Sequence, residues 1–91
     1  MLRRVVGDSM LPTLEPGQIV IGVKPRQIRA GQIVIINHGG HQKIKRLTEL
    51  SPAQIKVLGD NPKSSTDSRN FGWLPRSSVV ARVVWPRSEN L

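Results

Sequence analysis

The stretch "QIVIINHGGHQKIKRL", residues 32–47, decides the fold. Its two halves are rich in aliphatic and β-branched residues, and Gly39-Gly40 separates them. Gly-Gly between two such runs is a strong signal for a β-hairpin, because the tight two-residue turn needs positive φ angles, which glycine adopts without strain. We therefore predict that a strand over 32–36 pairs with a strand over 42–48.

The second of these strands sorts its side chains onto two faces. Lys43, Lys45 and Leu47 share one face, since successive side chains of a strand point to opposite sides. Ile44 and Arg46 belong to the other face. Lys45 is therefore expected beside aliphatic neighbours, with the charge of Arg46 directed away from it.

Similar short apolar runs recur along the chain between turn signals. No apolar periodicity of 3.6 residues extends beyond two turns, so helices are not expected to dominate. The predicted strands cover residues 3–6, 18–23, 32–36, 42–50, 54–59 and 78–85. This pattern predicts an all-β fold. The 91 residues are enough for one small domain, 1–91, in which we expect the tail 86–91 to be frayed.

The composition excludes several classes of protein. The chain has no cysteine, which excludes disulfides, a cysteine nucleophile and a thiolate zinc site. Apolar runs such as "IVIG" and "IVII" are far shorter than the roughly 20 residues that span a bilayer. We expect a location in the cytoplasm or at the membrane periphery. A membrane anchor removed from the natural protein stays an open alternative.

The chain is strongly basic. It has 14 lysines and arginines against 6 acidic residues, a net charge of +8. The cations are scattered and no aromatic ladder accompanies them, so we expect no base-stacking platform and no nucleic-acid partner. A solvated basic surface is the plain interpretation, and attraction to an anionic membrane surface or an acidic peptide stays open.

Ser9 is the first candidate for chemistry, within "GDSMLPTLEPGQIV" at residues 7–20. A serine nucleophile needs a base to remove its proton and donors to stabilise the oxyanion. Gly7 lets the backbone come close to a substrate, and Pro12 stiffens the segment after Ser9. The structural alternative is that Asp8 or Ser9 caps a helical turn over "MLPTL".

The candidate bases are histidines and lysines. His38 and His41 lie at the predicted hairpin tip, where a mobile turn would hold a catalytic base poorly, and we expect exposed turn residues and no metal site. A lysine with a pKa near ~10.4 must be buried among apolar groups to become neutral. Lys45 is placed for such burial, and Lys43 on the same face is its rival.

A long polar segment, "GDNPKSSTDSRNFGWLP" at residues 59–75, is the third feature. Asp67 and Arg69 are two apart and can pair across one side of an extended chain. Nearby hydroxyls could orient a lysine amine; they belong to Ser64, Ser65, Thr66 and Ser68. A polar surface loop is the alternative, although the length of the segment favours a function.

Four segments, in this order, resemble the type I signal peptidase family of Ser-Lys peptidases. They are "GDSMLPTLEPGQIV" (7–20), "RAGQIVII" (29–36), "IKRLTEL" (44–50) and "LGDNPKSSTDSRNFGWLP" (58–75). The resemblance implies that family's fold, a core of coiled antiparallel β-sheets in which a hairpin carries the lysine. It implies no cofactor and no metal.

The resemblance also implies roles for single residues. Ser9 matches the nucleophile and Lys45 the general base. Ser65 matches a serine that holds the lysine amine, and Asp67 and Arg69 match a supporting acid–base pair behind it.

Further positions match the turn and the substrate pockets of the family. Asp60 and Asn61 match the turn that precedes the supporting pair. The pockets for small substrate residues are matched by Val5, Met10, Leu14 and Ile44. Lys43 stands where the family often has an aromatic or apolar residue, so we expect an altered pocket.

The oxyanion site is expected to be built from backbone. By the resemblance, the N–H of Ser9 is one oxyanion donor. Gly7 stands where some family members carry a second donor serine, so no side-chain hydroxyl is expected there.

The chain departs from the family at several points. Gln18 and Gln32 replace the usual acidic residues, no transmembrane helix precedes Ser9, and a large insert before the last motif is missing. Such compact members also resemble nickel superoxide dismutase maturation peptidases. The expected function is a serine endopeptidase that removes an extended leader or signal peptide after small residues.

Two alternatives remain. One is a self-cleaving domain similar to those of SOS-response repressors, which also use a Ser-Lys pair; that alternative needs a cleavable segment upstream of Ser9, for which eight residues leave little room. The other is a basic β module without enzymatic activity that binds nucleic acid. Salt-dependent retention of DNA or RNA would favour the second.

Overall fold

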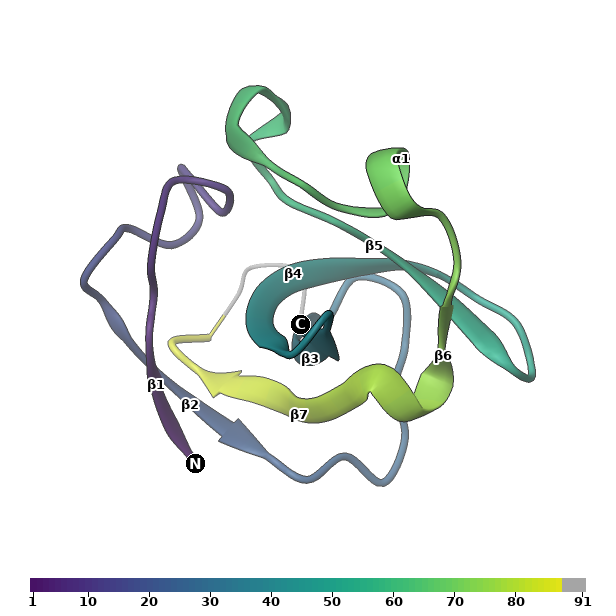
Figure 1. Ribbon diagram of the computed structural model, residues 1–91. Helices are drawn as coiled ribbons and strands as arrows, with labels where there is room; N and C mark the ends of the chain where they lie inside the picture. The colour runs from purple at the N-terminus through teal and green to yellow at the C-terminus, as the bar shows by residue number, and fades with distance from the viewer. Residues whose placement is uncertain (88–91) are drawn as a thin grey trace.

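The computed structural model describes residues 1–87, which form one seven-stranded antiparallel sheet (Figure 1). The strands are β1 (Leu2–Arg4), β2 (Ile19–Val23), β3 (Ile33–His38), β4 (His41–Leu50), β5 (Gln54–Leu58), β6 (Leu74–Pro75) and β7 (Val79–Trp85). Their order across the sheet is β1-β2-β7-β3-β4-β5-β6. The predicted all-β class is confirmed.

The hairpin predicted from residues 32–47 is present as β3 and β4. Its register sets Val34 opposite Lys45 and His38 opposite His41. Gly39 and Gly40 form the two-residue turn with φ of 60° and 79°. Positive φ at both central positions is what a tight hairpin turn requires, so the glycine pair explains the register of the strand that carries Lys45.

Strand β3 is the centre of the molecule, because hydrophobic clusters cover both of its faces. Ile33 and Ile35 pack into one cluster, and Val34 and Ile36 into the other. The first cluster contains Val5, Met10, Leu14, Val20, Ile33, Ile35, Ala81 and Val83. The second contains Val34, Ile36, Leu47, Ile55, Val57 and Leu74. The sheet coils so that its ends close over these two clusters (Figure 1).

The last strand, β7, joins the two parts of the sheet. It pairs with β2 on one side and with β3 on the other. At the β2 contact the backbones come close: a Cβ added to Gly22 would lie 3.0 Å from the Cβ of Ala81. Among the described strands, backbone pairing therefore connects β1 and β2 to the hairpin through β7.

Two short elements were not expected from the sequence. The two-residue strand β6 pairs with β5, and the single helical turn α1 (Ser68–Phe71) lies within the long polar segment. Two 3₁₀ turns, η1 (Pro62–Ser64) and η2 (Arg76–Ser78), flank these elements. Because each of these elements covers only two to four residues, no periodic pattern in the sequence could have predicted it.

The remaining expectations concern the two ends and membrane spans. In the N-terminal turn, the Leu14 N–H donates to the Met10 carbonyl at 2.9 Å, so a helical turn does form over "MLPTL". Of the tail 86–91, residues 88–91 lie outside the described residues. Within 1–87, no helix has the length and apolar character to cross a bilayer.

Candidate active site

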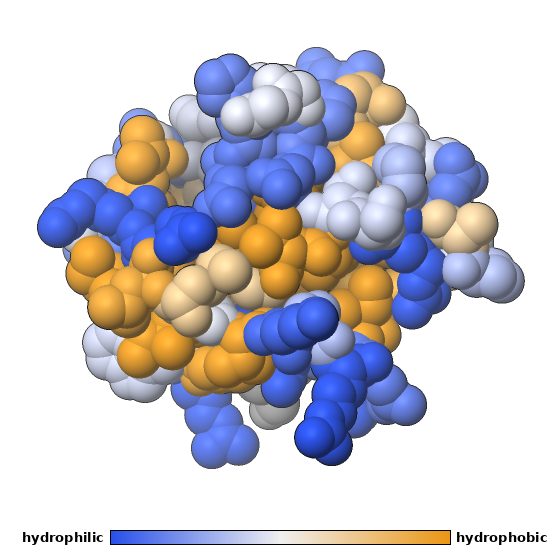
Figure 2. All heavy atoms as spheres, turned by 60° about the horizontal axis from the view of Figure 1, so that its bottom comes forward, coloured by the Kyte–Doolittle hydropathy of each residue, from blue (hydrophilic) through white to orange (hydrophobic). Residues whose placement is uncertain are grey.

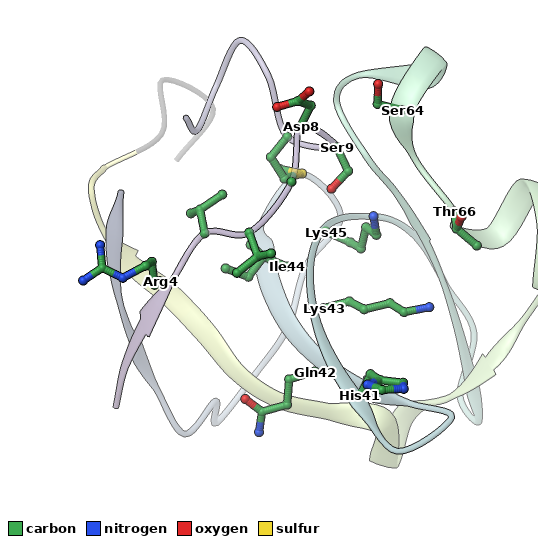
Figure 3. A pocket seen from close by; sticks show the side chains of 14 residues that line it. Arg4, Asp8, Ser9, His41, Gln42, Lys43, Ile44, Lys45, Ser64 and Thr66 are labelled. Carbon is green, nitrogen blue, oxygen red and sulfur yellow. The ribbon is translucent and has the colours of Figure 1, made fainter. Parts of the chain in front are cut away.

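A cavity of about 370 Å³ lies between the segment after β1 and the first half of β4 (Figure 3). Ser9 and Lys45 both line it, 36 positions apart in the chain and on different parts of the sheet. The full lining comprises residues 4–10 and 41–45 together with Ser64 and Thr66. In Figure 3 the hydroxyl of Ser9 points toward the side-chain nitrogen of Lys45.

Lys45 is a buried cation with one hydroxyl partner. Its residue surface is 4% exposed, and its Nζ donates to Ser65 Oγ at 3.2 Å. Loss of solvation lowers the pKa of Lys45, since burial penalises the charged ammonium. The carboxylate of Asp67 works against this shift, and the positive charges of Lys43 and Arg69 add to it. The sum of these effects is a lowered pKa, so the Lys45 amine becomes neutral at a lower pH than an exposed lysine does.

Asp67 anchors the group that holds the lysine. Its side chain is fully buried, and Oδ2 accepts from Ser65 Oγ at 2.6 Å and from the Gly59 N–H at 2.8 Å. Arg69 donates to both carboxylate oxygens. Burial alone would raise the pKa of Asp67, but the hydrogen bonds from Arg69, Ser65 and Gly59 outweigh it and hold the pKa far below its usual range.

The same carboxylate builds the local backbone. Asp67 caps helix α1 by accepting from the Arg69 N–H at 3.0 Å, and Asn70 completes a capping box. This one turn holds Ser65 and Asp67 in fixed relation to each other. The ordered chain Lys45–Ser65–Asp67–Arg69 therefore depends on a short helix within the long polar segment.

Gly59 is where three parts of the site meet. A Cβ at this position would lie 2.2 Å from Ser65 Oγ and 2.6 Å from the carbonyl oxygen of Ser9. No real side chain fits at such distances. Glycine is thus required here by close approach, and it lets the end of β5 lie against both the nucleophile segment and Ser65.

Asn61 fixes the segment that carries Ser9. Its N–H donates to the Ser9 carbonyl at 2.8 Å, and its side-chain amide donates to the Asp8 carbonyl at 3.1 Å. The Ser9 N–H itself donates to no acceptor within residues 1–87. Ser9 lines the cavity, and Gly7, two residues before it, has φ of 77°.

Asp60 ties the same loop to β4 from the opposite face of the strand. It accepts from Thr13 Oγ1 and forms an ion pair with Arg46 at 2.7 Å. Burial would raise the pKa of Asp60, but hydrogen bonds from Arg46 and Thr13 lower it overall. As expected from strand alternation, the charge of Arg46 is engaged away from Lys45.

The predicted pocket residues divide into two groups. Val5, Met10 and Ile44 line the cavity, as do Gly7 and Lys43. Leu14 does not line it; it lies wholly buried in the first hydrophobic cluster. Ser64 and Thr66 also line the cavity, whereas the Ser68 hydroxyl accepts a hydrogen bond from the Val57 N–H.

The histidine environment was only partly anticipated. His41 is exposed and lines the cavity, whereas His38 is half-buried and packs on Phe71, with ring centroids 4.2 Å apart. Lys43 Nζ lies 3.4 Å from His38 Nδ1 and 5.2 Å from the Phe71 ring. No group of three metal-ligating side chains exists among the described residues. Phe71, distant in sequence, gave no signal for this contact.

Comparison with known proteins gives a family and one partial relative. Signal peptidase I of Bacillus caldolyticus is 40% identical over 48 residues. That alignment covers 50% of this chain and 26% of the bacterial protein, so only a small part of the relative is matched. The profile of a serine peptidase-type family, described as Peptidase S24-like, matches residues 1–84, which is nearly the whole chain. The chain therefore belongs to the Peptidase S24-like family.

Proposed function

We propose that this chain is a serine endopeptidase in which Ser9 and Lys45 form a catalytic dyad that removes an extended leader or signal peptide after small residues. The observation that carries the proposal is the buried Lys45, held by Ser65 in the cavity into which Ser9 points. Burial lowers the pKa of Lys45 despite the opposing charge of Asp67, so this lysine loses its proton more easily, and a general base needs that property.

The steps follow from the positions of these groups. Neutral Lys45 takes the proton from Ser9 Oγ as the oxygen attacks the scissile carbonyl. The resulting oxyanion accepts a hydrogen bond from the Ser9 N–H, which has no other acceptor within residues 1–87. Lys45 then gives its proton to the leaving amine, and an acyl-enzyme remains on Ser9. Water, activated by Lys45, releases the acyl group and restores the serine.

The substrate binds in this proposal as an added strand. All of β4 from His41 to Arg46 pairs with β3, but β5 begins to pair only at Arg46. The other edge of residues 41–45 therefore has no strand partner within 1–87, and this edge borders the cavity. An extended peptide is placed to form backbone hydrogen bonds there, across from the segment that carries Ser9.

The floor of the cavity supports a preference for small residues. Val5 and Met10 line the cavity and are only 4% and 1% exposed, so they form part of its buried apolar wall. Ile44 adds a third apolar side chain to the lining. A shallow apolar floor admits alanine-sized side chains and obstructs larger ones.

The test is incubation with a diverse peptide pool, with cut sites determined by mass spectrometry. We expect cleavage after small residues by the wild-type chain and a loss of at least about 100-fold in Lys45→Ala, the size of a missing general base. Ser9→Ala should be inactive. Lys43→Ala is the matched control, because it removes a neighbouring lysine of the same cavity and should retain cleavage.

The outcomes separate the proposal from its alternatives. Unchanged cleavage by a folded Ser9→Ala protein would refute the dyad. Cleavage of the chain itself on alkaline incubation, without cleavage of added peptides, would favour the self-cleaving alternative. Circular dichroism on each variant establishes that a loss of activity is not a loss of fold.

A further inference from the structure

A second cavity, away from Ser9, is lined by cations. It has a volume of about 630 Å³ and lies beside the end of β2, the loop that follows it and β7. Its lining consists of Val23, Lys24, Arg26, Gln27, Arg29, Gln32 and Arg82. Four of the seven residues are basic and none is acidic. The cavity shares no residue with the one that holds Ser9 and Lys45.

Within residues 1–87, Lys24, Arg26 and Arg29 of this cavity form no ion pair. The ion pairs of residues 1–87 involve only Arg46, Lys56 and Arg69 on the basic side. Four like charges around one hollow repel each other, and an anion in the hollow relieves that repulsion.

Arg82 gives an independent sign of a missing acceptor. Its Nε is buried and has no hydrogen-bond partner among the described residues. Buried N–H groups are nearly always paired, so such an atom calls for an explanation. Arg82 sits in the middle of β7, opposite Val23 on one side and Val34 on the other, so its position is set by the sheet.

Neutral donors complete the lining. The Gln32 Oε1 accepts from the Arg29 N–H at 2.9 Å, which leaves its side-chain amide nitrogen as a donor. Guanidinium, ammonium and amide donors that line one cavity from different parts of the chain fit a ligand with three or more oxygens and a charge near −2. A carboxylate, with two oxygens and one charge, would leave most of these donors unused.

We propose that this cavity is a binding site for a phosphate-type oxyanion, either a free phosphate compound or a phospholipid headgroup. An exposed apolar strip adjoins the cavity and could contact lipid tails, which gives a reason to test the phospholipid headgroup. The strip comprises Leu2, Ile19, Ile21, Val23 and Trp85, which are 36–64% exposed. Figure 2, which brings forward the side at the bottom of Figure 1, shows hydrophobic surface beside strongly hydrophilic side chains.

The first arm of the test uses pyrophosphate as the probe. The ¹⁵N-labelled protein is titrated at constant ionic strength, with chloride replaced by pyrophosphate. We expect saturable shifts confined to residues 23–32 and the Arg82 side chain. Lys24→Gln and Arg26→Gln, both at exposed positions, should each weaken binding at least fivefold. Lys63→Gln makes the same charge change at an exposed position outside the cavity and should bind as the wild type does.

The second arm identifies the source of the phosphate. The protein is sedimented with vesicles of phosphatidylglycerol or of phosphatidylcholine. Binding to the anionic vesicles that Lys24→Gln weakens, without saturable pyrophosphate binding, assigns a lipid headgroup. Pyrophosphate binding without vesicle binding assigns a free phosphate compound. Binding in either arm that Lys63→Gln weakens as much as Lys24→Gln does, or no binding in both arms, overturns the proposal.

Discussion

The proposed chemistry depends on how single residues are placed around Lys45. Strand alternation alone left Lys43 and Lys45 as rivals on one face, and only the resemblance of "IKRLTEL" to a lysine motif favoured Lys45. Burial distinguishes them: Lys45 is 4% exposed, while Lys43 is half-buried and lies beside His38. Burial depends on the packing of the polar segment over the strand, which local sequence does not specify.

The pH dependence of cleavage should move in opposite directions in two variants. The dyad requires a neutral Lys45, so the rate rises as pH passes through its pKa. Lys43→Gln removes a positive charge that lowers this pKa. The rising part of the curve of rate against pH should therefore move to higher pH. Asp67→Asn removes a negative charge that raises this pKa, and the rising part should move to lower pH.

These shifts are measured from kcat/KM against pH with one peptide substrate. Asp67→Asn should also reduce the maximal rate, because the carboxylate orients Ser65. Movement of both curves in the same direction would contradict the proposed role of Lys45 as the base.

Replacing Gly59 should damage the site more than it damages the fold. In Gly59→Ala the new methyl group overlaps Ser65 and the Ser9 carbonyl, and relief of such overlap typically costs about 1–3 kcal/mol. We expect a folded protein, less stable in urea, with little peptidase activity.

Gly17→Ala is the control for this substitution. Gly17 has φ of 87° but no atom within 4 Å of an added Cβ. Its replacement should cost about 1–2 kcal/mol through backbone strain alone and leave activity intact. Equal activity in the two variants would show that close approach at Gly59 is not needed for catalysis.

At the scale of the elements, the hairpin and the polar segment were predictable to different degrees. The β3–β4 register followed from one glycine pair and the alternation of side chains. Helix α1 did not, because its single turn is held by the capping box between Asp67 and Asn70 and not by a periodic apolar face. Leu14 shows a third case: its motif position suggested a pocket residue, but its side chain is buried in the first hydrophobic cluster.

The unpaired edge of β4 predicts a periodic response to substrate modification. A good peptide substrate is made as a series in which one amide at a time upstream of the cut is N-methylated. Because only alternate amides of a strand donate to a given neighbour, losses of about tenfold should recur at every second position. Cleavage rates that fall equally at all positions would exclude strand addition at this edge.

At the scale of the whole molecule, acid should destabilise the fold through buried carboxylates. The pKa values of Asp60 and Asp67 are lowered in the folded state, so below about pH 4 the unfolded chain binds more protons than the folded chain. The resulting stability is present above that range and is lost as pH falls. Urea unfolding between pH 7 and 2 measures it.

The variant Asp67→Asn provides the comparison for acid stability. It should be less stable at neutral pH, since the replaced carboxylate accepts hydrogen bonds from Arg69, Ser65 and Gly59. Its stability should then fall less steeply below about pH 4 than that of the wild type. If stability falls with pH as steeply in the variant as in the wild type, Asp67 is not the group whose protonation destabilises the fold in acid.

The position of β7 has a consequence for the timing of biosynthesis. Ser9 follows β1 and Lys45 lies on β4, and among the described strands the backbone pairing that connects β1 and β2 to the hairpin runs through residues 79–85. Until these residues have left the ribosome, backbone pairing cannot connect β2 to β3, although loop contacts such as the Asn61–Ser9 hydrogen bond are already encoded. We therefore expect the proposed site to reach its final geometry late in synthesis.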